Sequence, residues 1–109
     1  MNVLAEICAT MDHCLAAAWV DTRTRVVLEQ RATRDDAFIA PVLEAVTEAM
    51  SSRERPPRMV LLSADHVHIA QRLTRDPHRV LVVICARAAN LGLVVAVIRS
   101  ILDAMEPST

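Results

Sequence analysis

The chain has 109 residues and a mass of 12.0 kDa, a length typical of one domain with its own hydrophobic core. Hydrophobic residues make up 53% of it and the formal net charge is −1, which argues against disorder and against binding of nucleic acid through the phosphate backbone. All 12 basic residues are arginines, and the chain has one glycine and two aromatic residues. This composition excludes a Schiff-base lysine, a glycine-rich phosphate loop and an aromatic platform for single-stranded nucleic acid.

Three cysteines, Cys8, Cys14 and Cys85, are an odd number in an apolar chain, which does not indicate a disulfide framework. We interpret them as buried reduced thiols. The first residues lack the basic segment of a secretory signal, and the longest apolar stretch, residues 91–98, ends at Arg99. A membrane span needs about 20 apolar residues. We therefore expect a cytoplasmic protein without membrane insertion.

The first half of the chain predicts a helix, a hairpin and a longer helix. Residues 3–11 place apolar side chains on one stripe behind a capping Asn2. Residues 14–20 and 25–32 are rich in β-forming residues and flank a short polar segment, which predicts a hairpin. The amphipathic helical pattern of the next segment begins at residues 33–36 and ends at Met50; Asp35 or Asp36 is its expected N-cap, and Pro41 is expected to kink its first turn.

The second half predicts three strands, at residues 58–64, 67–73 and 80–86, followed by a helix at residues 91–105. The last strand is apolar on both faces, as a central strand is. The final segment keeps helical spacing over a length that favours a helix over a strand, and Asn90 is a suitable N-cap. This order of helices and hairpins predicts an α/β sandwich of the α+β class, built around an antiparallel sheet.

The register of the last two strands follows from the turn between them. If Leu73 lies opposite Arg79, then His68 lies opposite Ile84 and Cys85 points to the other face of the sheet. A slip of one residue would reverse these faces.

The end of the chain resembles bacterial proteins of the roadblock family, which are dynein-light-chain-like and related to longin domains. The resemblance is carried by the strand Val-Leu-Val-Val-Ile-Cys-Ala at residues 80–86, a short loop, and Asn-Leu-Gly-Leu-Val opening the last helix at Asn90. The first part is also similar, with a short helix before Leu-Ala-Ala-Ala-Trp-Val-Asp at residues 15–21. One departure is the first hairpin turn, where the family often has glycine and this chain has Thr-Arg-Thr at residues 22–24.

The resemblance covers essentially the whole chain and implies a single roadblock-like domain at residues 1–109. It implies a five-stranded antiparallel sheet between one middle helix and two terminal helices. It also implies a two-fold homodimer, paired through the third strand and the middle helix. Several members of the family use this dimer as a platform for a Ras-like small GTPase, whereas others have no known GTPase.

The segment at residues 58–64 is also a candidate for self-association on physical grounds. As an edge strand it leaves backbone groups unpaired unless it meets another copy of the chain. The expected dimer interface comprises Met50, Met59, Leu61 and Ser63.

The polar side of the middle helix is the expected partner surface. It comprises Glu44, Thr47, Glu48 and Ser51, with Arg53 and Arg55 just beyond the helix. The alternative for the helix is an ordinary solvated face. The arginines, together with Arg58, form either a partner-facing basic edge, which could include an arginine finger, or a solvated loop that protects an edge strand.

The histidines and cysteines leave a metal or redox role open. His66 and His68 share a strand face, but no third ligand is near in sequence, and Cys8, His13 and Cys14 depart from the usual zinc spacing. A Cys–His nucleophile pair lacks a recognisable context. We therefore expect no catalytic residues, no metal and no cofactor.

Together these observations favour a non-enzymatic homodimer that scaffolds or regulates a Ras-like small GTPase. The alternative is a roadblock module that assembles a complex without a GTPase. A small metal or redox sensor is the third possibility.

Overall fold

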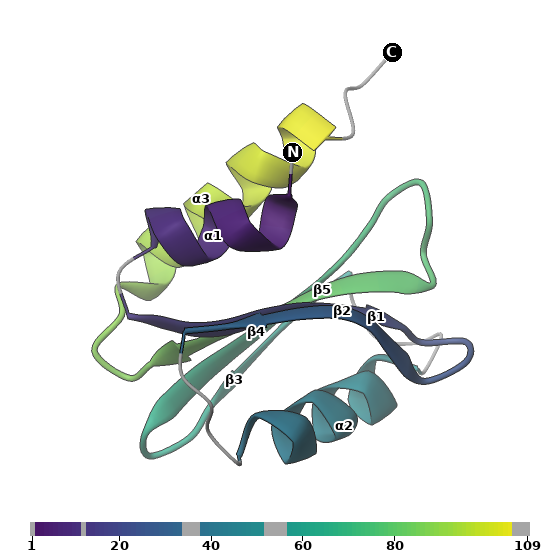
Figure 1. Ribbon diagram of the computed structural model, residues 1–109, viewed down its shortest axis with the longest axis horizontal. Helices are drawn as coiled ribbons and strands as arrows, with labels where there is room; N and C mark the ends of the chain where they lie inside the picture. The colour runs from purple at the N-terminus through teal and green to yellow at the C-terminus, as the bar shows by residue number, and fades with distance from the viewer. Residues whose placement is uncertain (1, 12, 34–37, 52–56, 106–109) are drawn as a thin grey trace.

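A five-stranded antiparallel sheet lies between one helix on one face and two helices on the other (Figure 1). The computed structural model describes residues 2–11, 13–33, 38–51 and 57–105. The elements in chain order are α1 (Val3–Thr10), β1 (Cys14–Asp21), β2 (Val26–Ala32), α2 (Ile39–Met50), β3 (Arg58–Leu62), β4 (His66–Arg72), β5 (Arg79–Ala86) and α3 (Leu91–Met105). The predicted α/β sandwich and its order of elements are confirmed, and none of the described helices is long and apolar enough to cross a membrane.

The strands are arranged β2-β1-β5-β4-β3, so β1 and β5 form the centre of the sheet. Both central strands are buried over nearly their whole length, because helices cover both faces. Ala16, Ala17 and Ala18 of β1 are buried, and their small side chains allow the helices to approach the strand closely. A β-bulge between Cys14 and Ala16 shifts the register of β1 against β5.

Two hydrophobic cores lie on opposite faces of the sheet. On one face α1 and α3 bury Leu4, Ile7, Val94, Ile98 and Leu102 against Trp19, Val83 and other inward residues of the sheet. On the other face α2 buries Ile39, Leu43, Val46 and Met50 against Val20, Val80, Val82 and Ile84. Burying a side chain of this size contributes roughly 1.5–3 kcal/mol of hydrophobic free energy.

The terminal helices begin where the sequence predicts. The Asn2 side-chain oxygen accepts a hydrogen bond from the Ala5 N–H at 3.0 Å, and that of Asn90 accepts one from the Leu93 N–H at 3.1 Å. Each cap satisfies an N–H group that has no partner inside its helix.

The middle helix begins later than the sequence predicts. It starts at Ile39, and its N-cap residue Phe38 forms no side-chain capping bond. The expected caps Asp35 and Asp36 lie outside the described residues. Pro41 is therefore the third residue of the helix, where a backbone N–H has no intrahelical partner, so the proline removes no hydrogen bond.

The predicted register of β4 against β5 is confirmed. His68 pairs with Ile84, Val67 pairs with Cys85, and the Leu73 N–H donates to the Arg79 carbonyl at 3.0 Å. As a result, Val67 and Ile69 face α1 and α3, whereas His66 and His68 lie on the α2 side of the sheet.

The β1–β2 turn closes without glycine. Asp21 accepts hydrogen bonds from the N–H groups of Arg23 and Thr24 at 2.8 and 3.2 Å, which lowers the pKa of its carboxyl group. Arg25 takes the left-handed conformation, with φ of 60°, that glycine often supplies in such turns.

The cap of α3 is tested by replacing Asn90. Asn90→Ala removes the acceptor for the Leu93 N–H and should lower the free energy of unfolding by about 1 kcal/mol, measured by urea denaturation. Asn90→Asp keeps an acceptor oxygen and should remain close to the unmodified protein. Equal stability of all three proteins would mean that this cap contributes nothing.

Candidate functional site

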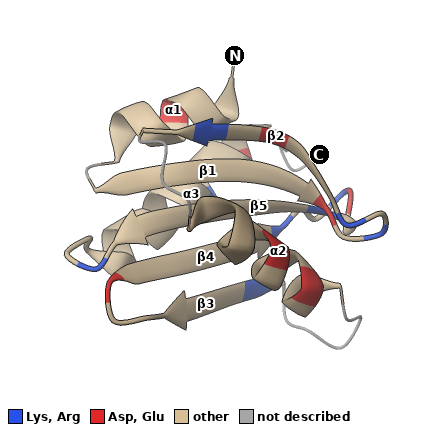
Figure 2. Cartoon of the chain, turned by 60° about the horizontal axis from the view of Figure 1, so that its bottom comes forward, with Lys and Arg blue, Asp and Glu red and all other residues tan. Residues whose placement is uncertain are grey.

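Strand β3 lies at one edge of the sheet, with β4 on one side and no strand of the described chain on the other (Figure 2). Backbone hydrogen bonds join β3 to β4 just beyond both ends of β3. The Arg72 N–H donates to the Pro57 carbonyl, and the Ser63 N–H donates to the His66 carbonyl. Hydrogen-bonded and non-bonded pairs alternate along an antiparallel ladder. The N–H and C=O groups of Met59 and Leu61 therefore face β4, whereas those of Arg58, Val60 and Leu62 face the open edge.

The side chains of this edge are apolar and accessible. Val60, Leu61 and Leu62 are 37%, 41% and 57% exposed. We call these three residues the β3 edge. An exposed apolar strand with unpaired backbone groups is a surface for pairing with another strand.

The other predicted interface residues differ in their access to solvent. Met59 packs partly buried against the core under α2, and Ser63 is exposed. Met50, the last residue of α2, is fully buried against the sheet, so its side chain offers no exposed surface for the predicted contact with a second copy. Its place in the apolar stripe of the helix explains its burial.

Two carboxylates project from the side of α2 that faces away from the sheet. Glu44 and Glu48 are exposed, and Figure 2 shows acidic residues on this helix in front of the sheet. Small residues beside them, which were not predicted as part of this surface, are also exposed: Ala40, Pro41 and Ala45. We call these five residues the α2 outer face.

Thr47 does not belong to the α2 outer face, and the expectation that it is exposed is wrong. It is buried, and its hydroxyl donates to the Leu43 carbonyl at 2.6 Å. This bond to the preceding turn satisfies the hydroxyl, so that Thr47 can lie beside Leu43 and Met50 in the inner stripe. Its position three and four residues from these core residues was the signal in the sequence.

The remaining predicted partner residues lie near the end of α2. Ser51 is half-buried, and its hydroxyl is within hydrogen-bond distance of the Thr47 and Thr22 carbonyls, at 2.7 and 3.2 Å. Arg53 and Arg55 lie outside the described residues. Glu48 forms an ion pair with Arg25 at 2.8 Å, and both side chains are exposed enough that the pair contributes little stability.

Aromatic rings line the sheet beside α2. Phe38 stacks on His66 with ring centroids 4.2 Å apart, and His66 lies 6.1 Å from His68. Nε2 of His68 is buried and has no hydrogen-bond partner in the described part of the chain. Burial, together with the charge of His66, lowers the pKa of His68, so its neutral form is favoured.

The cysteines gather where α1 meets the sheet. The Cys14 and Cys8 sulfur atoms are 3.8 Å apart, and Cys14 pairs with Cys85 across β1 and β5. Burial raises the pKa of Cys8 to about 12, and a hydrogen bond with Cys85 together with burial raises that of Cys14. The thiols of Cys8 and Cys14 are therefore held protonated, and a protonated thiol is a poor nucleophile, whereas the hydrogen bond with Cys14 lowers the pKa of Cys85. Within the described ranges, no group of three or more His, Cys, Asp or Glu residues could hold a metal ion.

The lowered pKa of His68 gives a dependence of stability on pH. Below a pH of about 6.5, His68 is protonated in the unfolded chain more readily than in the folded chain. The free energy of unfolding therefore falls as the pH falls. His68→Gln should therefore reduce the loss of melting temperature between pH 7.5 and pH 5.0. His13→Asn, at an exposed residue, is the control and should leave that loss unchanged. An equal loss in His68→Gln and the unmodified protein would contradict this account.

Solved structures of low sequence identity share this fold. Gliding protein MglB from Thermus thermophilus aligns with a TM-score of 0.77 at 16% identity, over 94% of this chain and 82% of MglB. MglC from Myxococcus xanthus aligns with a TM-score of 0.75 at 13% identity, over 94% of this chain and 92% of MglC. The Roadblock/LC7 domain from Streptomyces avermitilis aligns with a TM-score of 0.69 at 10% identity, over 96% and 92% of the two chains.

No protein-family model and no curated protein matches the sequence itself. The likeness to the solved structures therefore concerns the fold, and it agrees with the resemblance in the sequence. The chain has the fold of the Roadblock/LC7 domain proteins.

Proposed function

We propose that this protein is a non-enzymatic homodimer that scaffolds or regulates a Ras-like small GTPase. The observation that carries the proposal is the β3 edge, an accessible apolar strand with unpaired backbone groups beside α2. The roadblock-like pattern of the sequence implies a dimer built through these two elements and a GTPase as its partner.

In the proposed dimer, β3 pairs with β3 of a second copy. The groups of Arg58, Val60 and Leu62 that face the open edge are spaced for antiparallel pairing around a two-fold axis beside Val60. The two sheets then become continuous, and the exposed side chains of the β3 edge leave water. The second copy's α2 lies next to the first over the sheet, which brings the two α2 outer faces to one side of the dimer.

The α2 outer face is the proposed partner surface. Its carboxylates are accessible, and its small residues leave room for a partner to approach the helix. The similar structures include a gliding protein, MglB, and an MglB with a tetrameric arrangement, which supports a regulatory role through protein assembly.

The dimer is tested by Val60→Pro. The Val60 N–H faces the open edge, so proline removes no bond to β4 but blocks pairing with a second β3. We expect the unmodified protein to sediment as a dimer and Val60→Pro as a folded monomer, measured by analytical ultracentrifugation and circular dichroism. The matched variant Leu61→Pro removes a bond to β4 and should also destabilise the monomer. A concentration-independent monomer for the unmodified protein would contradict the proposed dimer.

The partner surface is tested by Glu44→Arg. Glu44 is exposed and has no ion pair within the described part of the chain. The free energy of unfolding of the variant should therefore lie within about 0.5 kcal/mol of that of the unmodified protein. The protein is used to capture its GTPase from native lysate, once with a GTP analogue and once with GDP. We expect the Glu44→Arg variant to capture several-fold less GTPase than the unmodified protein. Asp103→Arg reverses an exposed charge on α3, in the opposite layer, and should leave capture unchanged.

Capture of a multiprotein complex that contains no GTPase, with either nucleotide, would favour the assembly module without a GTPase. Unchanged capture by a normally folded Glu44→Arg variant would show that the α2 outer face is not the platform.

A further inference from the structure

Strand β2 is the second open edge of the sheet, opposite β3 (Figure 2). It pairs with β1 on one side, and no strand of the described chain lies on its other side. All seven of its residues are exposed, and the apolar ones at its start, Val26, Val27 and Leu28, are 50%, 40% and 46% exposed. The strand is therefore accessible for pairing with another strand.

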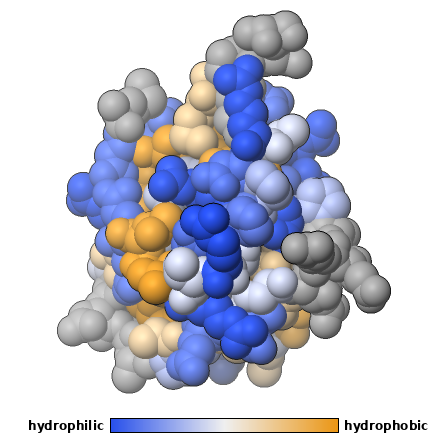
Figure 3. All heavy atoms as spheres, turned by 90° about the vertical axis from the view of Figure 1, so that its right-hand side faces the viewer, coloured by the Kyte–Doolittle hydropathy of each residue, from blue (hydrophilic) through white to orange (hydrophobic). Residues whose placement is uncertain are grey.

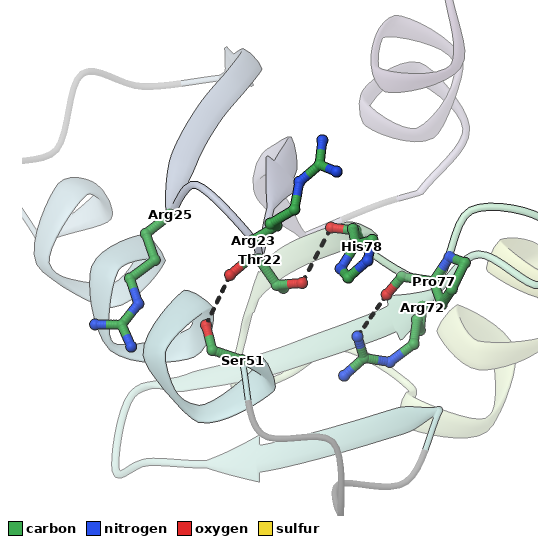
Figure 4. Close-up of a pocket in the computed structure, with 7 residues that line it drawn as sticks. All are labelled: Thr22, Arg23, Arg25, Ser51, Arg72, Pro77 and His78. Atoms are coloured by element: carbon green, nitrogen blue, oxygen red, sulfur yellow. Dashed lines mark hydrogen bonds between the residues drawn. The ribbon is translucent and has the colours of Figure 1, made fainter.

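The polar groups at the turn end of the sheet, in contrast, bind one another. This face of the molecule is mostly hydrophilic (Figure 3). It contains a hollow whose lining includes Thr22, Ser51 and Arg72 (Figure 4). The Thr22 hydroxyl donates to the His78 carbonyl at 3.1 Å, and the Arg72 guanidinium donates to the Pro77 carbonyl. The Ser51 hydroxyl lies 3.2 Å from the Thr22 carbonyl oxygen. Unpaired backbone groups are thus offered to a partner at the edges of the sheet rather than at this end.

The backbone groups of β2 that face solvent follow from its pairing with β1. The Thr33 N–H donates to the Leu15 carbonyl at 2.9 Å, just beyond the end of β2. Bonded and non-bonded residues alternate along an antiparallel ladder. The N–H and C=O groups of Glu29 and Arg31 therefore face β1, whereas those of Gln30 face the open edge.

Two opposite charges lie on one face of this edge, at Glu29 and Arg31. These residues pair with Trp19 and Ala17 of β1, whose side chains belong to the core under α1 and α3. The Asn2 side-chain amide donates to the Glu29 carboxylate at 3.1 Å. Both charged side chains are exposed, and neither has an ion pair within the described part of the chain. Each charge is therefore available to an opposite charge on a partner.

We propose that β2 pairs with β2 of a second copy of this chain, around a two-fold axis beside Gln30. In this register the Gln30 residues of the two copies exchange both backbone hydrogen bonds. Glu29 of each copy then lies opposite Arg31 of the other, which forms two cross-strand ion pairs. Leu28 lies opposite Ala32, so apolar surface leaves water. An axis beside Glu29 or Arg31 would instead place like charges opposite each other, so the charges select one register.

This pairing does not rest on the proposed β3 dimer or on a GTPase, since β2 and β3 form opposite edges of the sheet. Where both edges pair, dimers are joined edge to edge into larger assemblies. The paired part of β2 is polar, whereas the β3 edge is apolar. Because exposed ion pairs contribute less than buried apolar side chains, we expect β2 to pair at a higher protein concentration than β3.

The test is the mixing of two charge-reversal variants, Glu29→Arg and Arg31→Glu, followed by analytical ultracentrifugation over a range of concentrations. Each variant alone places like charges opposite each other and should associate through β2 at least about tenfold more weakly than the unmodified protein. One variant carries arginine at both positions and the other carries glutamate at both. In an equimolar mixture every charge of this edge therefore meets an opposite one, and we expect the association of the unmodified protein to return.

Arg99→Glu and Asp103→Arg are the matched control, because they reverse two exposed charges on α3. Each should associate as the unmodified protein does, whether alone or mixed, and circular dichroism checks that all four variants fold. The species at the lowest concentration, dimer or monomer, tests the β3 pairing separately. The β2 pairing is overturned if the unmodified protein forms no larger species as its concentration rises. It is also overturned if the mixture of Glu29→Arg and Arg31→Glu associates no better than either variant alone.

Discussion

Burial of β1 and β5 on both faces is the constraint on which the rest of the structure depends. Two adjacent strands without a solvent-facing side require apolar cover above and below, and the three helices supply it. The alanines at the middle of β1 allow helices on both faces to approach closely. The apolar stripe of each helix is therefore directed at the centre of the sheet, and the outer strands receive less cover.

The surfaces that can bind partners follow from this distribution of cover. Strand β3 keeps apolar side chains in contact with solvent, and α2 turns its carboxylates away from the sheet. The opposite edge is also accessible, since all seven residues of β2 are exposed, including Val26, Val27 and Leu28. Basic residues lie in turns at both ends of the sheet as well as on β2 and β3 (Figure 2).

Much of the fold could be predicted from the sequence, because the spacing of apolar residues and the positions of the polar turns determine each helix and strand locally. The opposition of Leu73 and Arg79 predicted the faces of His68 and Cys85, and the length of the last apolar pattern identified α3 as a helix. The candidate site was harder to predict, because a polar side chain can be buried when a carbonyl of its own helix accepts its hydrogen bond. Thr47 is such a residue. The hollow lined by Thr22, Ser51 and Arg72 likewise joins segments that are far apart in the chain, and nothing in local spacing predicts it.

Amide hydrogen exchange along β3 tests the central claim most directly, because it reads the groups that the proposed pairing would bond. The N–H groups of Val60 and Leu62 face the open edge, whereas those of Met59 and Leu61 face β4. If β3 pairs with a second copy, exchange at Val60 and Leu62 slows as the protein concentration rises, while exchange at Met59 and Leu61 is slow throughout. Fast exchange at Val60 and Leu62 at every concentration would contradict the claim.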